Sequence, residues 1–328
     1  MIVSALAELA ERDPERVFAS LNGEDLTIEQ LHRSASAFAA HLTALGRNPG
    51  DRAAVMMHNS LEAICVVFGL AMAGVAWVPV NPRLVGQSLS YQLDHSEPQL
   101  IICDEEFKQV VQRPEIISHG PDGRLSAVLN GNSTLPLSAR SDDDLFAIMY
   151  TSGTTGPPKG VMITHRMMAF AGEGVRQATG AESGDVMFMW EPLYHIGGAQ
   201  MLILPLLVPV KLALVTRFSA SQFWNQVEET GATHIHYLGG ILQMLLKQPP
   251  RPDDRAHGVR VAWGGGCPTE TWRQFQERFA IPIHECYGMS EASSLTSANV
   301  TGVVGSVGQP MEWLNVMIAD PGEAGRGE

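Results

Sequence analysis

The chain is poor in basic residues, and in lysine above all. Its 328 residues hold 22 Lys and Arg against 35 Asp and Glu, which gives a formal net charge of −13. Lysine occurs only at Lys108, Lys159, Lys211 and Lys247. Proteins that hold nucleic acid do so largely through cationic side chains on phosphates. This charge balance therefore argues against a nucleic-acid partner.

Cysteine is equally scarce. Cys65, Cys103, Cys267 and Cys286 lie far apart and form no CxxC pair, which argues against a disulfide framework or a zinc site. The segment Met1–Glu8 lacks a basic region followed by a long apolar one, so we do not interpret it as a signal peptide. Both observations favour a reducing, cytoplasmic compartment.

One uncharged run approaches the length of a membrane span. It covers Ala63–Val80, but two glycines and a proline interrupt it. We interpret it as a buried helix, Leu61–Ala73, followed by a buried strand, Ala76–Val80, because the cores of α/β folds commonly contain such runs. No membrane span is expected.

Short apolar runs alternate with helical patterns along the whole chain. The helix expected at 27–45 has Thr27 as its N-cap and Gln30 in the position of a capping box. This alternation predicts an α/β fold of two mostly parallel sheets, packed side by side and flanked by helices. Strands are expected at 53–57, 76–80, 100–103, near 125–129, at 145–149, 161–163, 186–189, 211–215, 233–237, 259–263 and 282–286. Further helices are expected at 61–73, 86–95, 165–178, 195–207, 219–229 (capped by Ser219), 240–247 and 268–279.

The loop Tyr150–Val161 reads Tyr-Thr-Ser-Gly-Thr-Thr-Gly-Pro-Pro-Lys-Gly-Val and separates two apolar runs. Its glycines let backbone N–H groups approach an anion, while its hydroxyls and Lys159 add donors and positive charge. This is the composition of a polyphosphate cradle. The loop differs from GxxxxGK[ST], because Pro158 precedes the lysine and Gly160 follows it. A surface linker is the less favoured alternative.

A second candidate segment, Tyr287–Glu291, directly follows the strand expected at 282–286. Ligands of open α/β folds bind beyond the carboxyl ends of strands. Tyr287 offers an aromatic face, Ser290 a hydroxyl and Glu291 a hard oxygen ligand suited to Mg²⁺. A hydrolase nucleophile elbow is disfavoured, because Ala292 stands where the elbow needs glycine and the residues that follow look extended.

Two further segments have competing interpretations. Gly264–Gly266 follows the strand expected at 259–263, and is either a plain turn or a place where a planar ring lies on bare backbone. His195 lies between a strand end and a helix start, and is either part of a site or a hydrogen-bonded core histidine. His234 and His236 share one face of a strand, but no further metal ligands are evident nearby.

Together these motifs resemble the adenylate-forming superfamily, which includes acyl-CoA synthetases, peptide-synthetase adenylation domains and luciferase. The loop at Tyr150 is similar to the family's phosphate loop, and segments similar to its other motifs follow in order at Tyr194-His195, Gly264–Gly266 and Tyr287–Glu291. Ser290 stands where threonine is usual and keeps the hydroxyl. The resemblance runs from about residue 10 to the end. Residues 190–299 look most like the crotonobetaine/carnitine-CoA ligase branch.

The resemblance implies a two-step reaction that uses ATP, Mg²⁺ and coenzyme A. A carboxylate attacks the α-phosphate of ATP to give acyl-AMP and pyrophosphate, and a thiol then attacks the acyl carbon. The resemblance gives catalytic roles to His195, Lys159 and Glu291, with Glu291 as the Mg²⁺ ligand. It implies nucleotide-binding roles for Thr151, Ser152, Gly153, Thr154, Thr155, Gly156, Lys159, Gly265, Gly266, Tyr287, Gly288 and Ser290.

The sequence also bears on the acid that would be activated. Amino-acid-activating relatives carry an aspartate near Tyr194–Gly197, and this chain has none there. We therefore expect a small or medium acyl acid without an α-amino group. A quaternary ammonium group would want aromatic faces, for which Tyr237, Trp190 and Trp263 are candidates. The expected pocket comprises Ile196, Gly197, Met201, His236, Tyr237, Leu238, Gly239, Gly264 and Cys286.

Two other classes of function stay open at this point. One is an adenylating enzyme that loads a carrier protein, and the other is a non-catalytic nucleotide-binding module. A homodimer also stays open. Family members continue through a Tyr-x-Thr-Gly-Asp segment and a small domain with a catalytic lysine, whereas this sequence ends at Glu328 with no lysine after Glu291.

The domain organisation expected from the resemblance is a single large N-terminal adenylation domain, 1–328, incomplete at its C-terminus and without the small C-terminal domain. Its expected subdomains are 60–175 and 10–59 plus 180–312. We expect this fragment alone to bind nucleotide weakly and to turn over poorly.

Overall fold

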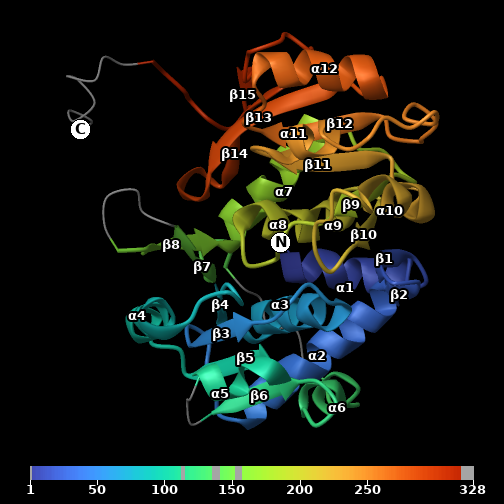
Figure 1. The fold of residues 1–328 in the computed structure, drawn as a ribbon. Helices are drawn as coiled ribbons and strands as arrows, with labels where there is room; N and C mark the ends of the chain where they lie inside the picture. Colours follow the sequence, from blue (N-terminus) through green and yellow to red (C-terminus); the bar gives the residue numbers. More distant parts are fainter. Residues whose placement is uncertain (1, 112–114, 135–140, 152–156, 319–328) are drawn as a thin grey trace.

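The computed structural model describes residues 2–111, 115–134, 141–151 and 157–318. It contains two sheets, stacked with helices between and around them (Figure 1). Each sheet is parallel except at its edges, so the expectation of two mostly parallel, helix-flanked sheets is confirmed.

The smaller sheet has six strands in the order β6-β5-β3-β4-β7-β8. Only the β7–β8 pair is antiparallel, and it carries the ends of the expected phosphate loop. The expected subdomain boundary at residues 59/60 does not follow the sheets, because β3 pairs with β4 and β5 rather than with strands of the other sheet. The strands are β3 (Arg52–Met56), β4 (Ala76–Pro79), β5 (Leu100–Asp104), β6 (Ile116–His119), β7 (Leu145–Thr151) and β8 (Lys159–Thr164).

The larger sheet has nine strands in the order β15-β14-β13-β12-β11-β9-β10-β1-β2. Its central strands, from β1 to β13, are parallel, so their carboxyl ends meet at one edge. The strands are β1 (Val17–Leu21), β2 (Glu24–Thr27), β9 (Val186–Met189), β10 (Lys211–Leu214), β11 (His234–Leu238), β12 (Val261–Gly265), β13 (Ile283–Met289), β14 (Ser294–Asn299) and β15 (Gln309–Pro310).

The largest apolar core fills the space between the two sheets. It includes helices α1 (Ile2–Arg12), α2 (Ile28–Ala44), α3 (Leu61–Ala73) and α7 (His165–Thr179). Strand residues alternate between layers: Val55 of β3 faces this core, while Ala54 and Met56 face a smaller outer core. That outer core is covered by α4 (Gly86–Ser96) and α5 (Lys108–Val111), and the outer face of the larger sheet by α10 (Phe223–Thr230), α11 (Ile241–Leu246) and α12 (Thr269–Phe279).

The capping box expected at Thr27 is present. The Gln30 N–H donates to Thr27 Oγ1 at 3.2 Å, and the Thr27 N–H donates to Gln30 Oε1 at 2.9 Å. The helix over 61–73 also has the expected bounds, and it ends at Gly74 in the left-handed conformation. No helix among the described residues is long and apolar enough to cross a membrane.

Three local predictions are wrong. The segment near 125–129 is helix α6 (Leu125–Leu129), whose buried Leu125 and Leu129 lie one helical turn apart. Helix α10 begins at Phe223, so Ser219 does not cap it. The single helix expected over 195–207 is instead α8 (Ile196–Ala199), the 3₁₀ turn η2 (Gln200–Ile203) and α9 (Leu204–Leu207), with Pro205 in the first turn of α9. Two short 3₁₀ turns, η1 (Glu105–Phe107) and η3 (Ser290–Ala292), complete the described elements.

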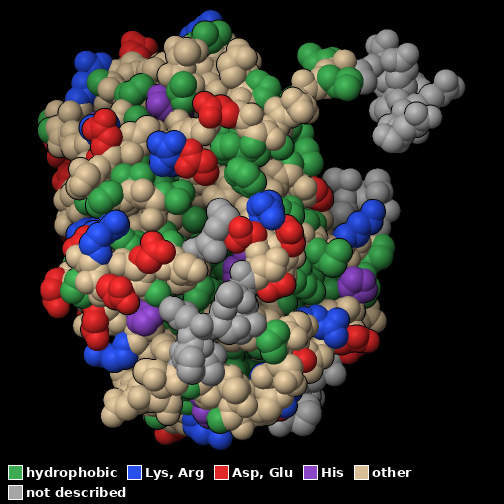
Figure 2. Space-filling model, turned by 180° about the vertical axis from the view of Figure 1, so that it is seen from behind, with side chains coloured by type: hydrophobic (Ala, Val, Ile, Leu, Met, Phe, Trp, Pro, Cys, Tyr) green, Lys and Arg blue, Asp and Glu red, His purple; other side chains and the backbone are tan. Residues whose placement is uncertain are grey.

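Charged groups of both signs are spread over the surface. On the face shown in Figure 2, Lys and Arg side chains are scattered among Asp and Glu side chains.

The half-buried His119, at the end of β6, is expected to make stability depend on pH. Its Nδ1 lies 3.0 Å from Asp104 Oδ1, and its Nε2 lies 3.8 Å from Glu62 Oε1. The hydrogen bonds to Asp104 and Glu62 raise the pKa of His119 from 6.5 to about 10. Because the folded state binds this proton more tightly than the unfolded state, the stabilisation is complete below about pH 6.5 and is lost as the pH approaches 10.

We therefore expect His119→Gln to lower the free energy of unfolding by roughly 1–2 kcal/mol at pH 6, a value discounted for solvent screening. The deficit relative to wild type should vanish above about pH 10. Urea unfolding of both proteins at several pH values measures this difference in the free energy of unfolding. A deficit that does not change between pH 6 and pH 10 would contradict the assignment.

Candidate functional site

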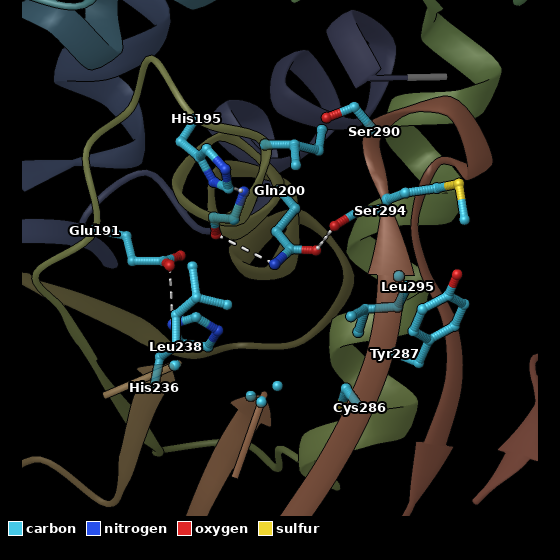
Figure 3. A pocket seen from close by; sticks show the side chains of 18 of the residues that line it. Glu191, His195, Gln200, His236, Leu238, Cys286, Tyr287, Ser290, Ser294 and Leu295 are labelled. Atoms are coloured by element: carbon cyan, nitrogen blue, oxygen red, sulfur yellow. Dashed lines mark hydrogen bonds and ion pairs between the residues drawn. The ribbon is translucent and has the colours of Figure 1, made fainter. Parts of the chain in front are cut away.

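A cavity of about 550 Å³ opens where β11, β12 and β13 end, as Figure 3 shows from close by. It brings together segments that are far apart in the sequence: the end of β7, the segment before α8, the glycines at the end of β12 and the turn η3. The residues that line it are Thr151, Glu191, His195, Ile196, Gly197, Gln200, His236, Leu238, Gly239, Gly264, Gly265, Gly266, Cys286, Tyr287, Gly288, Met289, Ser290, Glu291, Ser294 and Leu295.

The glycines at the end of β12, Gly264 and Gly265, and Gly266 directly after it form one wall of the cavity. Gly264 has φ +152°, and a Cβ at this position would overlap the carbonyl oxygen of Tyr237 on the neighbouring strand. The same segment is fixed by the buried carboxylate of Glu285, whose Oε1 accepts hydrogen bonds from the N–H groups of Gly266 at 2.8 Å and Cys267 at 3.0 Å. The glycines are therefore a rigid, bare backbone surface rather than a loose turn. The sequence analysis did not identify Glu285.

The segment Tyr287–Glu291 lines the same cavity as the glycines. Strand β13 continues to Met289 and pairs with β14, and Gly288 is required there because a Cβ would overlap the carbonyl oxygen of Ser294. Tyr287 is 49% exposed and faces the cavity, followed by Ser290 and Glu291 in η3. Since β14 is a strand, the helix that a nucleophile elbow needs is not there.

His195 is the N-cap residue of α8 and reaches the cavity from the side opposite Ser290 (Figure 3). Its Nδ1 accepts a hydrogen bond from the Gly197 N–H at 3.2 Å. A nitrogen that accepts carries no proton, so the neutral imidazole keeps its proton on Nε2. His195 can therefore donate a hydrogen bond from Nε2. It is not a core histidine, because its side chain is exposed.

The expected phosphate loop is described only at its two ends. Ser152, Gly153, Thr154, Thr155 and Gly156 lie outside the described residues. Thr151 lines the cavity, and Lys159 pairs with Thr151 across the β7–β8 ladder but is not among the lining residues.

Helix α4 holds both ends of this loop. The hydroxyl of Tyr91 donates to the carbonyl oxygen of Pro158 at 3.1 Å, and Nδ1 of His95 lies 2.6 Å from the hydroxyl of Tyr150. Sequence reasoning missed Tyr91 and His95, because nothing in the helical pattern of α4 identifies them as partners of the loop.

The residues expected in the substrate pocket fall into two groups, those that line the cavity and those that do not. Seven of the nine line the cavity: Ile196, Gly197, His236, Leu238, Gly239, Gly264 and Cys286. Tyr237 and Met201 are buried and are not lining residues. Tyr237 is 0% exposed and points to the outer core, because side chains alternate along β11 and His236 faces the cavity.

The cavity also has a polar side that the sequence analysis did not identify. Glu191 and His236 form one buried pair, with 3.3 Å between Oε1 and Nδ1. Gln200 and Ser294 form another, in which the Ser294 hydroxyl donates to Gln200 Oε1 at 2.6 Å. Figure 3 shows both pairs pointing into the same space.

The thiols near the cavity are not reactive nucleophiles. Burial raises the pKa of Cys286 to about 12, and it does the same for Cys267. Because the thiolate is the nucleophilic form, both groups stay protonated and weakly reactive at neutral pH.

Glu291 would have to hold a metal ion as a single protein ligand. Within the described ranges, three ligand atoms of His, Cys, Asp or Glu come together only at His58, Asp104 and Glu106, away from Glu291. Neither His234 nor His236 belongs to a group of this kind in the part of the chain that the structure describes.

A second cavity, of about 700 Å³, lies on the other side of the segment before α8. The odd-numbered Glu191 and His195 face the first cavity, while Trp190, Pro192 and Tyr194 face the second. The segment is therefore a thin wall between the two. The second cavity is lined by Met57, His58, Asn59, Asn81, Pro82, Arg83, Trp190, Pro192, Tyr194, Thr216, Arg217 and Phe218.

These features define an α/β domain with a cavity at the carboxyl ends of its strands. The chain belongs to the AMP-binding enzyme family, whose model matches residues 6–328. It is 35% identical to the human long-chain fatty acid transport protein 1 over 92% of this chain and 50% of that protein. It is 28% identical to the medium/long-chain-fatty-acid–CoA ligase FadD6 of Mycobacterium tuberculosis, over 95% of this chain and 55% of that enzyme.

The structural comparison agrees. The crystal structure of ATP-bound MatB from Rhodopseudomonas palustris superposes with a TM-score of 0.85 and 25% identity, over 95% of this chain and 65% of MatB. The chain thus spans between half and two thirds of the lengths of these relatives. The resemblance inferred from the motifs is confirmed at the level of the family.

Proposed function

We propose that the protein is the adenylate-forming part of an ATP-dependent acid–CoA ligase that acts on a small or medium acid without an α-amino group. The observation that carries the proposal is one cavity bordered by the bare glycine backbone, Tyr287, Ser290, Glu291, His195 and the end of the phosphate loop. A planar base, a phosphate group and a carboxylate all find suitable partners there.

The adenine would lie between two walls of the cavity. Gly265 and Gly266 offer a flat backbone surface, and the exposed ring of Tyr287 faces the same space. Ser290 offers a hydroxyl to the α-phosphate, while Thr151 and Lys159 stand at the two ends of the loop that would hold the β- and γ-phosphates. Such positioning is the main catalytic contribution in phosphoryl-type transfers.

His195 would act as a hydrogen-bond donor in this site. Its Nε2–H can donate to an oxygen of the substrate carboxylate or of the α-phosphate. Negative charge collects on the α-phosphate oxygens as the carboxylate attacks phosphorus, and a fixed donor stabilises that charge without reorganisation. Removal of the proton from the acid is not needed, because a carboxylic acid is already ionised at neutral pH.

The residues present suit a magnesium ion. Glu291 is one exposed carboxylate at the cavity, and Mg²⁺ at nucleotide sites typically takes one or two carboxylates together with phosphate oxygens and water. When bound, the ion would neutralise phosphate charge. Glu291 would hold it against the nucleotide.

The second cavity suits the thiol substrate. Arg83 and Arg217 supply positive charge for phosphates, and Trp190 and Phe218 supply aromatic faces. The thin wall at 190–195 separates this cavity from the space near His195 that would receive the acyl group. These properties fit coenzyme A and favour it over a carrier protein, which remains the second candidate. A cytoplasmic location belongs to the same proposal, since all four cysteines are unpaired.

The test is acid-dependent exchange of pyrophosphate into ATP by the complete gene product, measured over a panel of carboxylic acids with and without coenzyme A. Exchange without coenzyme A, together with thioester formation in its presence, would support the ligase. Exchange without thioester formation would indicate carrier-protein loading. Nucleotide binding without exchange for any acid would indicate a binding module.

Lys159→Ala tests the phosphate loop directly on this chain. A charge-assisted hydrogen bond contributes about 1.5–3 kcal/mol, so we expect affinity for Mg²⁺-ATP to fall about 10- to 100-fold. Titration calorimetry measures it. Lys247→Ala is the matched control, because Lys247 is an exposed lysine at the end of α11. Equal losses in the two variants would contradict a phosphate-binding role.

A further inference from the structure

The carboxylate of Glu191 is buried in the wall of the first cavity without enough partners. Glu191 is 4% exposed. Of its two carboxylate oxygens, Oε1 has a basic neighbour, His236 Nδ1 at 3.3 Å. Among the described residues, neither Glu191 Oε2 nor His236 Nδ1 makes a hydrogen bond. Buried polar atoms are rarely left in this state, because their desolvation is costly.

The surrounding chain holds this carboxylate in place. Asn59 fixes the segment from both sides, since its Nδ2 donates to the carbonyl oxygen of Glu191 at 2.8 Å and its Oδ1 accepts from the Leu193 N–H at 2.9 Å. Gly197 makes room, because a Cβ there would overlap Glu191 Oε2. The partner His236 is fixed as well, since Trp190 Nε1 donates to its carbonyl oxygen at 2.7 Å.

Glu191 and His236 both line the part of the cavity that would receive the acyl group. A plain alkyl end would leave Oε2 without a partner, and a second carboxylate would be repelled by the charge of Glu191. A group that donates hydrogen bonds would satisfy Oε2, and donors that carry a positive charge make the strongest such bonds.

We propose, on the basis of the function proposed above, that Glu191 selects acids whose acyl part carries a hydrogen-bond donor, with a positively charged nitrogen preferred over a hydroxyl. Glu191 is then the residue that determines specificity, and Gly197 and His236 position it. The requirement for a buried ionic partner separates this protein from an enzyme that accepts simple fatty acids.

The experiment uses the complete gene product and pyrophosphate exchange with three acids of equal chain length that end in an ammonium, a hydroxyl or a methyl group. In wild type we expect kcat/KM to be about 10- to 100-fold higher for the ammonium acid than for the methyl acid, the size of a charge-assisted hydrogen bond. The hydroxyl acid should fall between them. Glu191→Gln should abolish the preference for ammonium over hydroxyl, and Glu191→Leu should favour the methyl acid.

The control is Glu229→Gln, an exposed glutamate on α10, which should keep the wild-type order of the acids. Thermal unfolding checks that each variant folds. A wild-type preference for the methyl acid, an order that is unchanged in both Glu191 variants, or an equal loss for all three acids would overturn the inference. The absence of exchange with every acid would instead overturn the proposed function, so the two failures are distinguishable.

Discussion

Gly264→Ala is expected to lower the free energy of unfolding by roughly 3 kcal/mol or more, and to abolish nucleotide binding. The new methyl group would overlap the carbonyl oxygen of Tyr237 in the adjacent strand, so a backbone rather than a side chain must move. Gly264 also has φ +152°, a conformation that alanine rarely adopts. Both effects act at the wall on which the adenine would lie.

Urea unfolding measures the loss of stability, and titration with ATP measures the loss of nucleotide binding, on the same preparation. Gly258→Ala is the matched control, because a Cβ there would meet its nearest atom, the carbonyl oxygen of Ala232, at 3.9 Å. We expect the control to unfold within about 0.5 kcal/mol of wild type. A Gly264 variant that is as stable as the control, with normal affinity for ATP, would show that the strand ends can separate.

Much of the fold follows from patterns that a sequence displays directly. Leu61–Ala73 is bounded by a serine cap and a glycine, and both bounds are confirmed. The segment Leu125–Leu129 was misjudged because five residues are too few to separate a strand from one helical turn. The break after Ala199 was missed for a similar reason: a 3₁₀ turn of four residues leaves no separate periodicity in the sequence.

For the site, too, sequence motifs predict some residues, while others depend on tertiary contacts that the sequence does not display. Residues within recognisable motifs, such as His195, Gly264 and Tyr287, are brought together as the motif order predicts. Tyr237 was placed in the pocket beside His236, although adjacent side chains of a strand face opposite sides. Glu285 was missed because its partners come from other strands and from backbone N–H groups.

Removal of the buried carboxylate of Glu285 is the second change for which we expect a large loss of stability. This carboxylate accepts three hydrogen bonds, from the N–H groups of Gly266 and Cys267 and from the hydroxyl of Tyr237 at 2.5 Å. In Glu285→Ala the two N–H groups can turn to water in the cavity, but the Tyr237 hydroxyl is 0% exposed and cannot. We expect the free energy of unfolding to fall by about 3 kcal/mol, since each unsatisfied buried group costs about 1–3 kcal/mol.

A double-mutant cycle with Tyr237→Phe isolates the cause. The tyrosine variant alone removes one hydrogen bond and should cost about 1 kcal/mol, because Glu285 keeps both backbone donors. In the double variant the hydroxyl no longer lacks a partner, so the two losses should sum to more than the measured loss by about 1–2 kcal/mol. Glu277→Ala, an exposed glutamate on α12, is the control. Additive losses would mean that Glu285 acts only through Gly266 and Cys267. The glycine wall would then not depend on the hydrogen bond to Tyr237 of β11.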